Sequence, residues 1–162
     1  MKIITLSEKQ TIDLGKKIAK QLTGGETIAL IGELGAGKTI FTKGIASELG
    51  IKKTITSPTF VLMKIYPVKS RKAGSPMAKF NRVNPVNNQQ PIINNLVHVD
   101  AYRLNSGQDL IDIGIEDYLG QKNTITIIEW ANQVDSILPK NTIFVKIKVE
   151  SNGKKRVISI KK

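Results

Sequence analysis

The chain has 162 residues, of which 40% are hydrophobic, and this length and composition predict one globular domain large enough for a hydrophobic core. It contains no cysteine and a single histidine, His98, which excludes disulfides, thiol catalysis and cysteine-ligated metal, and makes a histidine-based zinc site unexpected. The formal net charge of +12 favours contact with nucleic acid or with an acidic protein surface, although solubility alone is an alternative explanation.

We expect neither a membrane segment nor a secretory signal. No apolar run approaches the roughly 20 residues that cross a bilayer as a helix. Residues 1–8 lack the apolar core and the small-residue cleavage site of a signal peptide. These features predict a cytoplasmic protein with no membrane association.

The first elements of the chain are predicted to be a strand, a helix and a second strand. Residues 2–5 have the composition of a short strand, and Ser7 is a suitable N-cap for a helix that runs to about Leu22. Residues 23–25 contain two glycines and end this helix. The apolar run over residues 27–31 has the length of a buried strand.

A glycine-rich phosphate-binding loop follows this strand. The pattern Gly32-x-x-x-x-Gly37-Lys38-Thr39 stands between the strand and a predicted helix through Leu49, which is the context of a P-loop. Its glycines allow successive backbone N–H groups to face a polyphosphate, and the helix directs its positive end at the same phosphates. Lys38 adds a charge for the β- and γ-phosphates, and the Thr39 hydroxyl is placed to hold Mg²⁺. The alternative is a glycine-rich turn beside a surface lysine.

A basic segment interrupts the middle of the chain. Residues 60–66, after the polar turn at residues 57–59, are aromatic and branched enough to form a strand. Residues 67–95 then contain four prolines and five basic residues but no acidic residue. Long segments without apolar periodicity are usually functional or disordered. We interpret this one as a flexible basic insertion at the tip of a long hairpin.

Two later strands each end in a carboxylate. Residues 96–99 lead into Asp100, and residues 125–128 lead into Glu129. Nucleotide-hydrolysing P-loop proteins place an acid near Mg²⁺ at the end of a buried strand. Asp100 and Glu129 both fit this role, in which a carboxylate binds the ion or positions the attacking water. The alternative for each is an ordinary strand-terminal acid that faces solvent.

The remaining elements complete an α/β domain. We predict a helix from Ser106, a short helix over residues 115–119, and a carboxyl-terminal hairpin of residues 142–150 and 156–160. Trp130, the only tryptophan, either stacks in the site or anchors the core. His98 is expected to be a packed or hydrogen-bonded residue rather than an acid–base group.

Four motifs together resemble those of the bacterial TsaE (YjeE) family. They occur in the family's order, at residues 32–39, 56–60, 98–104 and 128–130. The likeness covers nearly the whole chain apart from the 67–95 insertion. The expected fold is a single P-loop NTPase-like domain over residues 1–162, in three layers with a central, mostly parallel sheet and a carboxyl-terminal hairpin.

The resemblance implies a small Mg²⁺-dependent ATPase that works with the proteins TsaB and TsaD. These partners place a threonylcarbamoyl group on N6 of adenosine 37 in tRNA, and the ATP cycle of TsaE supports or resets the complex that contains TsaD. Hydrolysis by the isolated chain should be slow, because no obvious arginine finger is present. Arg103 is the in-chain candidate for that role. Contact with tRNA is expected to be indirect or through a basic surface.

The resemblance also assigns roles to individual residues. The phosphates are expected to be held by Gly35, Ala36, Gly37, Lys38, Thr39 and Ile40. Thr39 and Glu129 are expected to serve Mg²⁺, while Asp100 faces the γ-phosphate and its water, so that Lys38, Asp100 and Glu129 form the catalytic set. Residues 57–60 are expected to act as a switch segment with Thr59 as its polar contact. The adenine pocket is expected to draw on the segment near Glu8 and the turn around Gly153.

Two other functions remain open at this point. A nucleotide or metabolite kinase would carry several arginines in a lid, whereas residues 67–95 contain only two, Arg71 and Arg82. An RNA-binding module that uses nucleotide as a switch would interleave stacking aromatics with its basic residues, and no such pattern is visible.

Overall fold

The structure, a computed structural model, describes residues 1–68, 93–150, 153 and 155–162. Most of the predicted basic insertion at residues 67–95 therefore lies outside the described residues. The same is true of residues 151, 152 and 154 in the predicted hairpin turn.

A seven-stranded sheet forms the centre of the molecule, in the order β1-β7-β6-β2-β5-β4-β3. The four central strands β6, β2, β5 and β4 run parallel to one another, and the pairs β1–β7, β7–β6 and β4–β3 are antiparallel. The strands are β1 (Lys2–Thr5), β2 (Thr27–Ile31), β3 (Met63–Pro67), β4 (Asn95–Asp100), β5 (Thr124–Glu129), β6 (Ile143–Val149) and β7 (Arg156–Lys161). The predicted α/β class, the parallel centre of the sheet and the carboxyl-terminal hairpin are confirmed.

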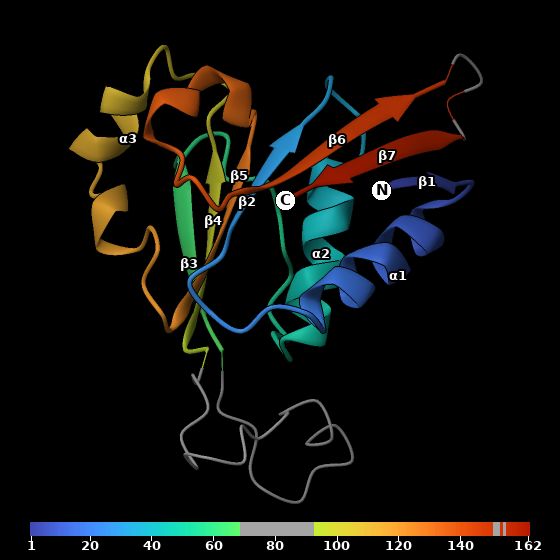
Figure 1. The fold of residues 1–162 in the computed structure, drawn as a ribbon, viewed down its shortest axis with the longest axis horizontal. Helices are drawn as coiled ribbons and strands as arrows, with labels where there is room; N and C mark the ends of the chain where they lie inside the picture. Colours follow the sequence, from blue (N-terminus) through green and yellow to red (C-terminus); the bar gives the residue numbers. More distant parts are fainter. Residues whose placement is uncertain (69–92, 151–152, 154) are drawn as a thin grey trace, which may run out of the picture.

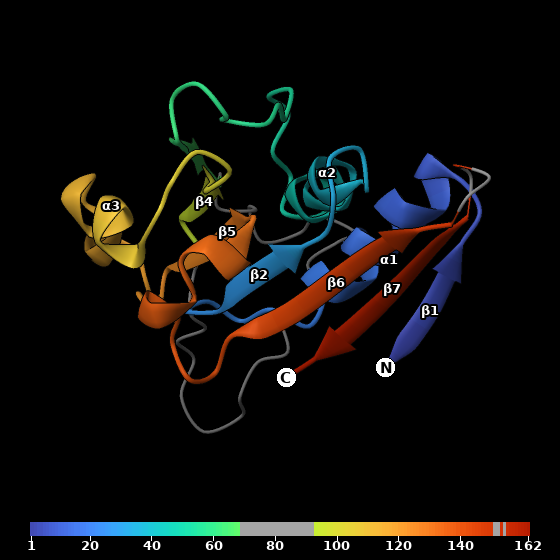
Figure 2. The ribbon, with the colours of Figure 1, turned by 90° about the horizontal axis from the view of Figure 1, so that it is seen from above.

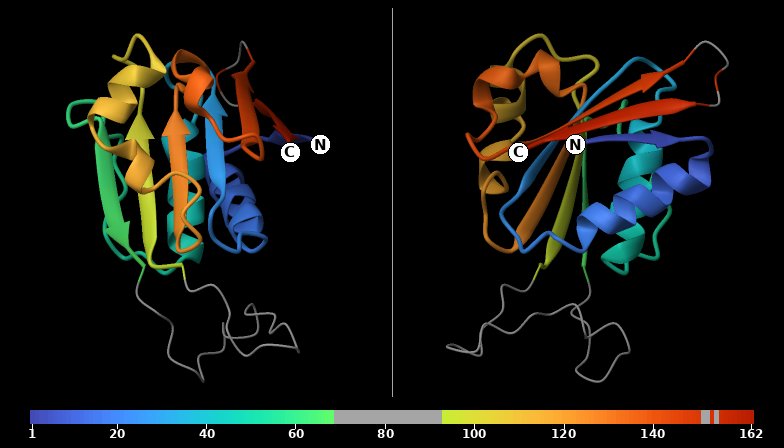
Figure 3. Two further views of the ribbon diagram at one scale, coloured as in Figure 1. Left: turned by 60° about the vertical axis from the view of Figure 1, so that its left-hand side comes forward. Right: turned by 45° about the vertical axis from the view of Figure 1, so that its right-hand side comes forward.

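Helical segments cover the sheet from both sides and make three layers (Figures 1 and 3). Helices α1 (Glu8–Ala19) and α2 (Lys38–Glu48) lie on one face. Helix α3 (Gly107–Asp112) and the 3₁₀ segments η2 (Ile115–Asp117), η3 (Ala131–Gln133) and η4 (Asp135–Ile137) lie on the other. Strand β5 is buried along its whole length, as its run of β-branched residues predicts for a strand covered on both faces.

Two glycines allow α1 and α2 to approach closely. A Cβ on Gly15 would overlap the carbonyl oxygen of Phe41, and a Cβ on Gly44 would overlap that of Ile12. The two helices therefore meet backbone to backbone at this crossing. This contact fixes α2, which begins at the phosphate-binding loop, against the amino-terminal helix.

Three boundaries differ from the sequence-based prediction. The helix predicted to reach Leu22 ends at Ala19, after which N–H groups of residues 21 and 22 bond to the carbonyls of residues 18 and 19 in a tighter turn. The helix predicted over residues 115–119 is a 3₁₀ turn over Ile115–Asp117.

The third difference concerns the strand predicted from Phe60. It begins only at Met63, because the N–H groups of Val61 and Leu62 both bond to the carbonyl of Pro58 and close a turn. Leu62 has a φ of 61°, which is incompatible with a strand. Phe60 is consequently in the turn, where it is 84% exposed.

Candidate functional site

The glycine-rich loop joins the carboxyl end of β2 to the amino end of α2, as predicted (Figure 1). Gly35 and Gly37 have φ angles of 75° and 105°, which residues with a Cβ rarely adopt. Gly37 is the N-cap of α2, and it provides no side chain to bond the first N–H groups of the helix. The first turn also contains no acidic residue. No side chain of the first turn therefore neutralises the positive end of α2, which is available to an anion.

Lys38 is buried beneath this loop. Its Nζ donates hydrogen bonds to the carbonyl oxygens of Gly32, at 2.7 Å, and Glu33, at 2.9 Å. The same atom lies 3.8 Å from the ring centroid of Trp130, a cation–π distance. Burial lowers the pKa of Lys38 below that of an ordinary lysine, and the carboxylates of Glu129 and Asp100 partly offset this effect.

Glu129 lies directly beside the start of α2. Its position follows from the parallel register of β2 and β5, which pairs it with Leu30. The Thr39 hydroxyl lies 2.8 Å from Oε1 and 3.1 Å from Oε2 of the carboxylate, to which it donates. The predicted pairing of Thr39 with a strand-terminal acid is thus present in space.

His98 holds the same carboxylate from the other side. Its Nε2 lies 2.8 Å from Oε1 of Glu129, and both side chains are buried. A carboxylate oxygen accepts hydrogen bonds, so Nε2 is the ring nitrogen placed to donate to it. Nδ1 has no hydrogen-bond partner within the part of the chain that the structure describes. The expectation of a hydrogen-bonded histidine is confirmed, but its link to the predicted metal ligand was not foreseen.

Asp100 stands at the end of β4, in register with Glu129 on β5. Its Oδ2 accepts hydrogen bonds from the hydroxyls of Ser57 and Thr59, the latter at 2.6 Å. Its Oδ1 accepts the N–H of Tyr102 at 3.0 Å. The predicted switch turn is therefore attached to the second carboxylate through two hydroxyl groups.

Two aromatic residues close the side of the site next to β5. Trp130 has a φ of 58° and its ring lies 5.0 Å from that of Tyr102. The only tryptophan of the chain therefore covers the Lys38 amine while its other side packs on the core. Arg103, the in-chain candidate for an arginine finger, places its guanidinium 4.8 Å from the ring centroid of Phe60 in the switch turn.

Arg156 is a site neighbour that sequence reasoning missed. Its Nε donates to the carbonyl oxygen of Ala36 at 3.2 Å, across 120 positions of the chain. The only signal was its place at the start of the last predicted strand. Through its pairing with Thr5, Arg156 also brings the start of β7 beside the end of β1.

The two residues assigned to an adenine pocket lie in these same neighbouring segments. Glu8 begins α1 shortly after Thr5, and Gly153 stands in the turn before β7, where its φ is 67°. Both are exposed. The fold brings their segments to the loop end of the sheet, and their contact with a base stays a prediction.

The donor set suits a nucleotide phosphate with Mg²⁺. The hydroxyl of Thr39 and the carboxylate of Glu129 are oxygen ligands of the kind that Mg²⁺ prefers. Among the described residues, no group of three acidic or histidine side chains is placed to hold a metal ion alone. Phosphate and water oxygens would have to complete the coordination, which is the usual arrangement for Mg²⁺ at nucleotide sites.

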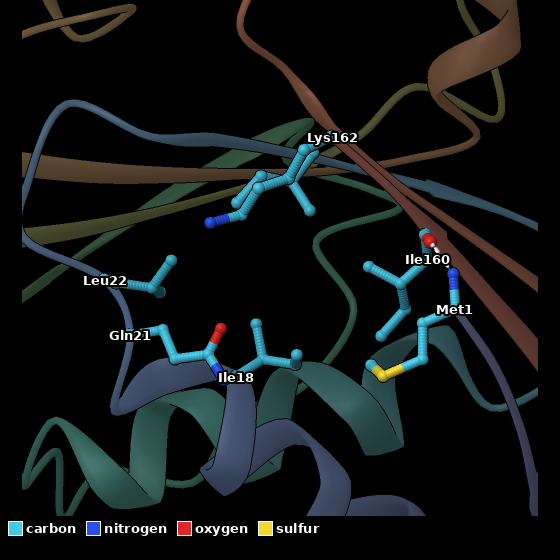
Figure 4. Close-up of a pocket in the computed structure, with 7 residues that line it drawn as sticks. Met1, Ile18, Gln21, Leu22, Ile160 and Lys162 are labelled. Carbon is cyan, nitrogen blue, oxygen red and sulfur yellow. Dashed lines mark hydrogen bonds between the residues drawn. The ribbon is translucent and has the colours of Figure 1, made fainter.

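The apolar hollow shown in Figure 4 is separate from this arrangement. It has a volume of about 190 Å³ and is lined by Met1, Ile18, Leu22 and Ile160, among others. These residues belong to the end of α1 and the opposite end of the sheet from the glycine-rich loop. The loop, the two carboxylates and Lys38 remain the candidate site.

In the described part of the chain, no helix combines the length and apolar character needed to cross a membrane.

Comparison with known proteins gives one consistent family. A family model described as "Threonylcarbamoyl adenosine biosynthesis protein TsaE" matches residues 5–158. The chain is 32% identical over 157 residues to a protein of Treponema pallidum named "tRNA threonylcarbamoyladenosine biosynthesis protein TsaE", covering 97% of this chain and 98% of that one. A protein of the same name from Rickettsia typhi is also 32% identical over 157 residues, covering 96% and 91%. Among solved structures, YdiB of Bacillus subtilis superposes with a TM-score of 0.69 at 27% identity, covering 99% of this chain and 83% of that chain.

Proposed function

Because the chain belongs to the TsaE family of threonylcarbamoyl adenosine biosynthesis proteins, we propose that it binds ATP with Mg²⁺ and hydrolyses it to ADP and phosphate. The hydrolysis serves the formation of N6-threonylcarbamoyladenosine in tRNA. The observation that carries this proposal is the meeting of Lys38, Thr39, Glu129 and Asp100 at the amino end of α2. A loop that is only structural has no need of two buried carboxylates beside a buried lysine.

In this proposal the glycine-rich loop binds the triphosphate. The backbone N–H groups of residues 35–40 and the positive end of α2 surround the phosphates. Lys38 leaves the carbonyl groups of Gly32 and Glu33 and turns its charge toward the β- and γ-phosphates. These carbonyl bonds keep the amine at the loop whose N–H groups would surround the phosphates.

Thr39 and Glu129 would hold Mg²⁺, which neutralises phosphate charge when it is bound. The Thr39 hydroxyl donates to Glu129 in the structure, and it would turn its lone pairs to the ion instead. His98 keeps Oε1 of Glu129 in place during this exchange. The carboxylate is thus oriented before the metal arrives.

Asp100 and the switch turn respond to the γ-phosphate. Asp100 accepts the hydroxyls of both Ser57 and Thr59 in the structure. If the Thr59 hydroxyl donated its hydrogen bond to the γ-phosphate instead, Oδ2 of Asp100 would lose one of its two donors and could accept a proton from the attacking water. The exposed Phe60 would move with the turn, which gives a partner protein a way to sense the nucleotide.

We further propose that TsaB and TsaD are the partners and that the ATP cycle resets the complex that contains TsaD. Arg103 stacks on Phe60 and lies outside the group of residues around Lys38, which fits slow turnover by the chain alone and stimulation by a partner.

Reconstitution of tRNA modification with TsaB and TsaD tests this function. The wild-type chain should permit many rounds of modification per TsaD molecule, whereas Lys38→Ala and Glu129→Ala should limit the reaction to about one round. Lys43→Ala, an exposed change on the same helix, is the matched control and should behave as wild type. Equal product with and without the chain would contradict the proposal, and accumulation of a phosphorylated acceptor rather than phosphate would favour a kinase.

A further inference from the structure

The outer face of strands β1, β7 and β6 is open, whereas the rest of the sheet is covered on both sides. Figure 2 shows α1 and α2 on one side of these three strands and no helix on the other. The residues that face inward, such as Val145, Ile147 and Ile158, are buried against the two helices. The alternate residues of β6, namely Phe144, Lys146 and Lys148, are exposed on the open side.

Lysines from all three strands meet on this face. The register places Lys146 opposite Ser159, which is itself opposite Lys2, and places Phe144 opposite Lys161. Lys148 lies two pairs further along, on the same side of the sheet, opposite Val157. We call the exposed set formed by Lys2, Lys146, Lys148 and Lys161 the lysine face. Three of them, Lys2, Lys146 and Lys161, line an open depression together with Phe144 and Ser159.

Two regions of the described chain each carry charge of a single sign. Strands β1, β6 and β7 together contain five basic residues and no acidic residue. Residues 105–120, which include α3 and η2, contain four acidic residues and no lysine or arginine. These two regions lie at opposite sides of the molecule (Figure 1). Solubility requires a net charge but no such separation, so the separation points to an oriented approach of a polyanion.

We propose that the lysine face binds the phosphate backbone of folded RNA. Lysine is depleted at protein–protein interfaces, whereas interfaces with nucleic acid are strongly basic and polar. The face offers four flexible ammonium groups and one exposed aromatic ring, Phe144, with no deep apolar pocket for a protein side chain. Lysines act as point charges on phosphates, so the binding should depend on salt and little on base sequence.

Strand β6 runs beside the start of the glycine-rich loop, because Lys146 pairs with Ile31, but its lysines lie on the open side of the sheet and can be tested separately from the nucleotide site. None of the lysines of the lysine face takes part in the hydrogen bonds around Lys38, Glu129 and Asp100. The choice of tRNA as the biological ligand rests on the proposed function, whereas binding to an RNA backbone does not. An unrelated folded RNA of the same length therefore belongs in the same experiment.

The test is fluorescence anisotropy of labelled unmodified tRNA, and of the unrelated RNA, titrated with the full chain at several salt concentrations. The face variant combines Lys146→Gln, Lys148→Gln and Lys161→Gln. The control variant combines Lys17→Gln, Lys43→Gln and Lys52→Gln, which removes the same charge from exposed positions elsewhere. ATP hydrolysis by both variants, expected to equal that of wild type, shows that each has folded.

The face variant should bind both RNAs roughly 10- to 100-fold more weakly than wild type at low salt, and its slope of log affinity against log salt should be smaller by up to about 3. The control variant should stay within a few fold of wild type. Equal losses in both variants would show a general effect of net charge and overturn the proposal.

Three further outcomes would also overturn it. These are no measurable binding by wild type, binding that disappears only on deletion of residues 69–92, and loss of affinity for TsaD rather than for RNA in the face variant. Failure of the proposed function alone gives another result: both RNAs bind through the lysine face, but the chain does not increase tRNA modification.

Discussion

Lys38 is a buried amine that two backbone carbonyls and an indole ring hold beneath the glycine-rich loop. Removing its side chain in Lys38→Ala takes away the charge that the proposed site directs at the phosphates. We expect ATP binding to weaken by about 100-fold or more, measured by equilibrium titration with a fluorescent ATP analogue. Lys43→Ala on the exposed side of the same helix should bind as wild type. Unchanged affinity in Lys38→Ala would remove the lysine from the site.

The pH dependence of Lys38 has opposite signs for binding and for stability. Its pKa is lowered below 10.5 by burial, so its charge is lost at a lower pH than that of an exposed lysine. ATP affinity should therefore decline with rising pH at a lower pH than an exposed lysine would give. The unfolded chain holds this proton more tightly, so the free energy of unfolding should rise with pH between the lowered pKa and 10.5. Denaturant titrations of wild type and Lys38→Met across this range isolate the contribution of the lysine to the free energy of unfolding. A difference in that free energy that does not vary with pH would contradict the lowered pKa.

Glu129 is expected to act in hydrolysis more than in binding. Glu129→Ala removes the carboxylate but leaves the loop and Lys38 intact, so ATP should still bind while phosphate release falls by about 100-fold or more. Binding is followed by titration and turnover by phosphate release. Normal turnover in this variant would exclude the acid from the mechanism.

His98 is expected to position Glu129. His98→Leu removes one of the two hydrogen bonds at Oε1 of Glu129 and leaves the other, from Thr39, so the carboxylate should be less well oriented and turnover should fall. His98→Gln can place an amide N–H near the position of Nε2 and should restore most of the activity. Measuring turnover against Mg²⁺ concentration distinguishes a positioning role of His98 from a packing role, because poor orientation of Glu129 should raise the Mg²⁺ requirement. Equal defects in both variants would indicate a packing role only.

At the level of secondary structure elements, the close crossing of α1 and α2 fixes the helix that begins at the glycine-rich loop. Gly44→Ala would place a methyl group against the carbonyl of Ile12. Alanine normally stabilises a helix by about 0.5–1 kcal/mol relative to glycine, but the overlap with backbone should reverse the sign and cost about 1–3 kcal/mol. Thermal unfolding should show a lower midpoint, while Ser47→Ala, at an exposed position of the same helix, should not. A midpoint equal to wild type would show that the helices can separate without penalty.

Elements that depend on contiguous residues could be predicted from the sequence. The loop was visible because Gly32, Gly37, Lys38 and Thr39 are fixed by spacing, and the two acids were visible because each ends an apolar run. The start of β3 was placed too early, because a turn at Pro58 and the left-handed Leu62 override the aromatic and branched composition.

Contacts between distant elements could not be predicted in the same way. The strand order that inserts β6 between β2 and β7 brings Arg156 to Ala36, and no local pattern specifies that order. The attachment of Ser57 and Thr59 to Asp100, and of His98 to Glu129, likewise depends on which strands are neighbours. A polar residue within an otherwise apolar strand, such as His98, is the sequence feature that most directly predicts such a hydrogen-bond partner.

At the scale of the whole molecule, the two proposed functions use different parts of one sheet. The central parallel strands end at the proposed ATP site, and the antiparallel strands at one edge form the lysine face. The switch turn, with exposed Phe60, lies toward the other edge next to β4. RNA contact on the lysine face could therefore change independently of the nucleotide, whereas contact with a partner at Phe60 would follow the nucleotide state in the proposed cycle.

The most direct test of the proposed ATP site is calorimetric titration of the chain with a non-hydrolysable ATP analogue in the presence and absence of Mg²⁺. The wild-type chain should bind one analogue per chain, more tightly with Mg²⁺. This gain should be lost when Thr39→Val removes the hydroxyl that faces Glu129. No uptake of the analogue, or an affinity indifferent to Mg²⁺ in the wild-type chain, would contradict a site in which the glycine-rich loop and the strand-terminal carboxylates hold nucleotide and metal together.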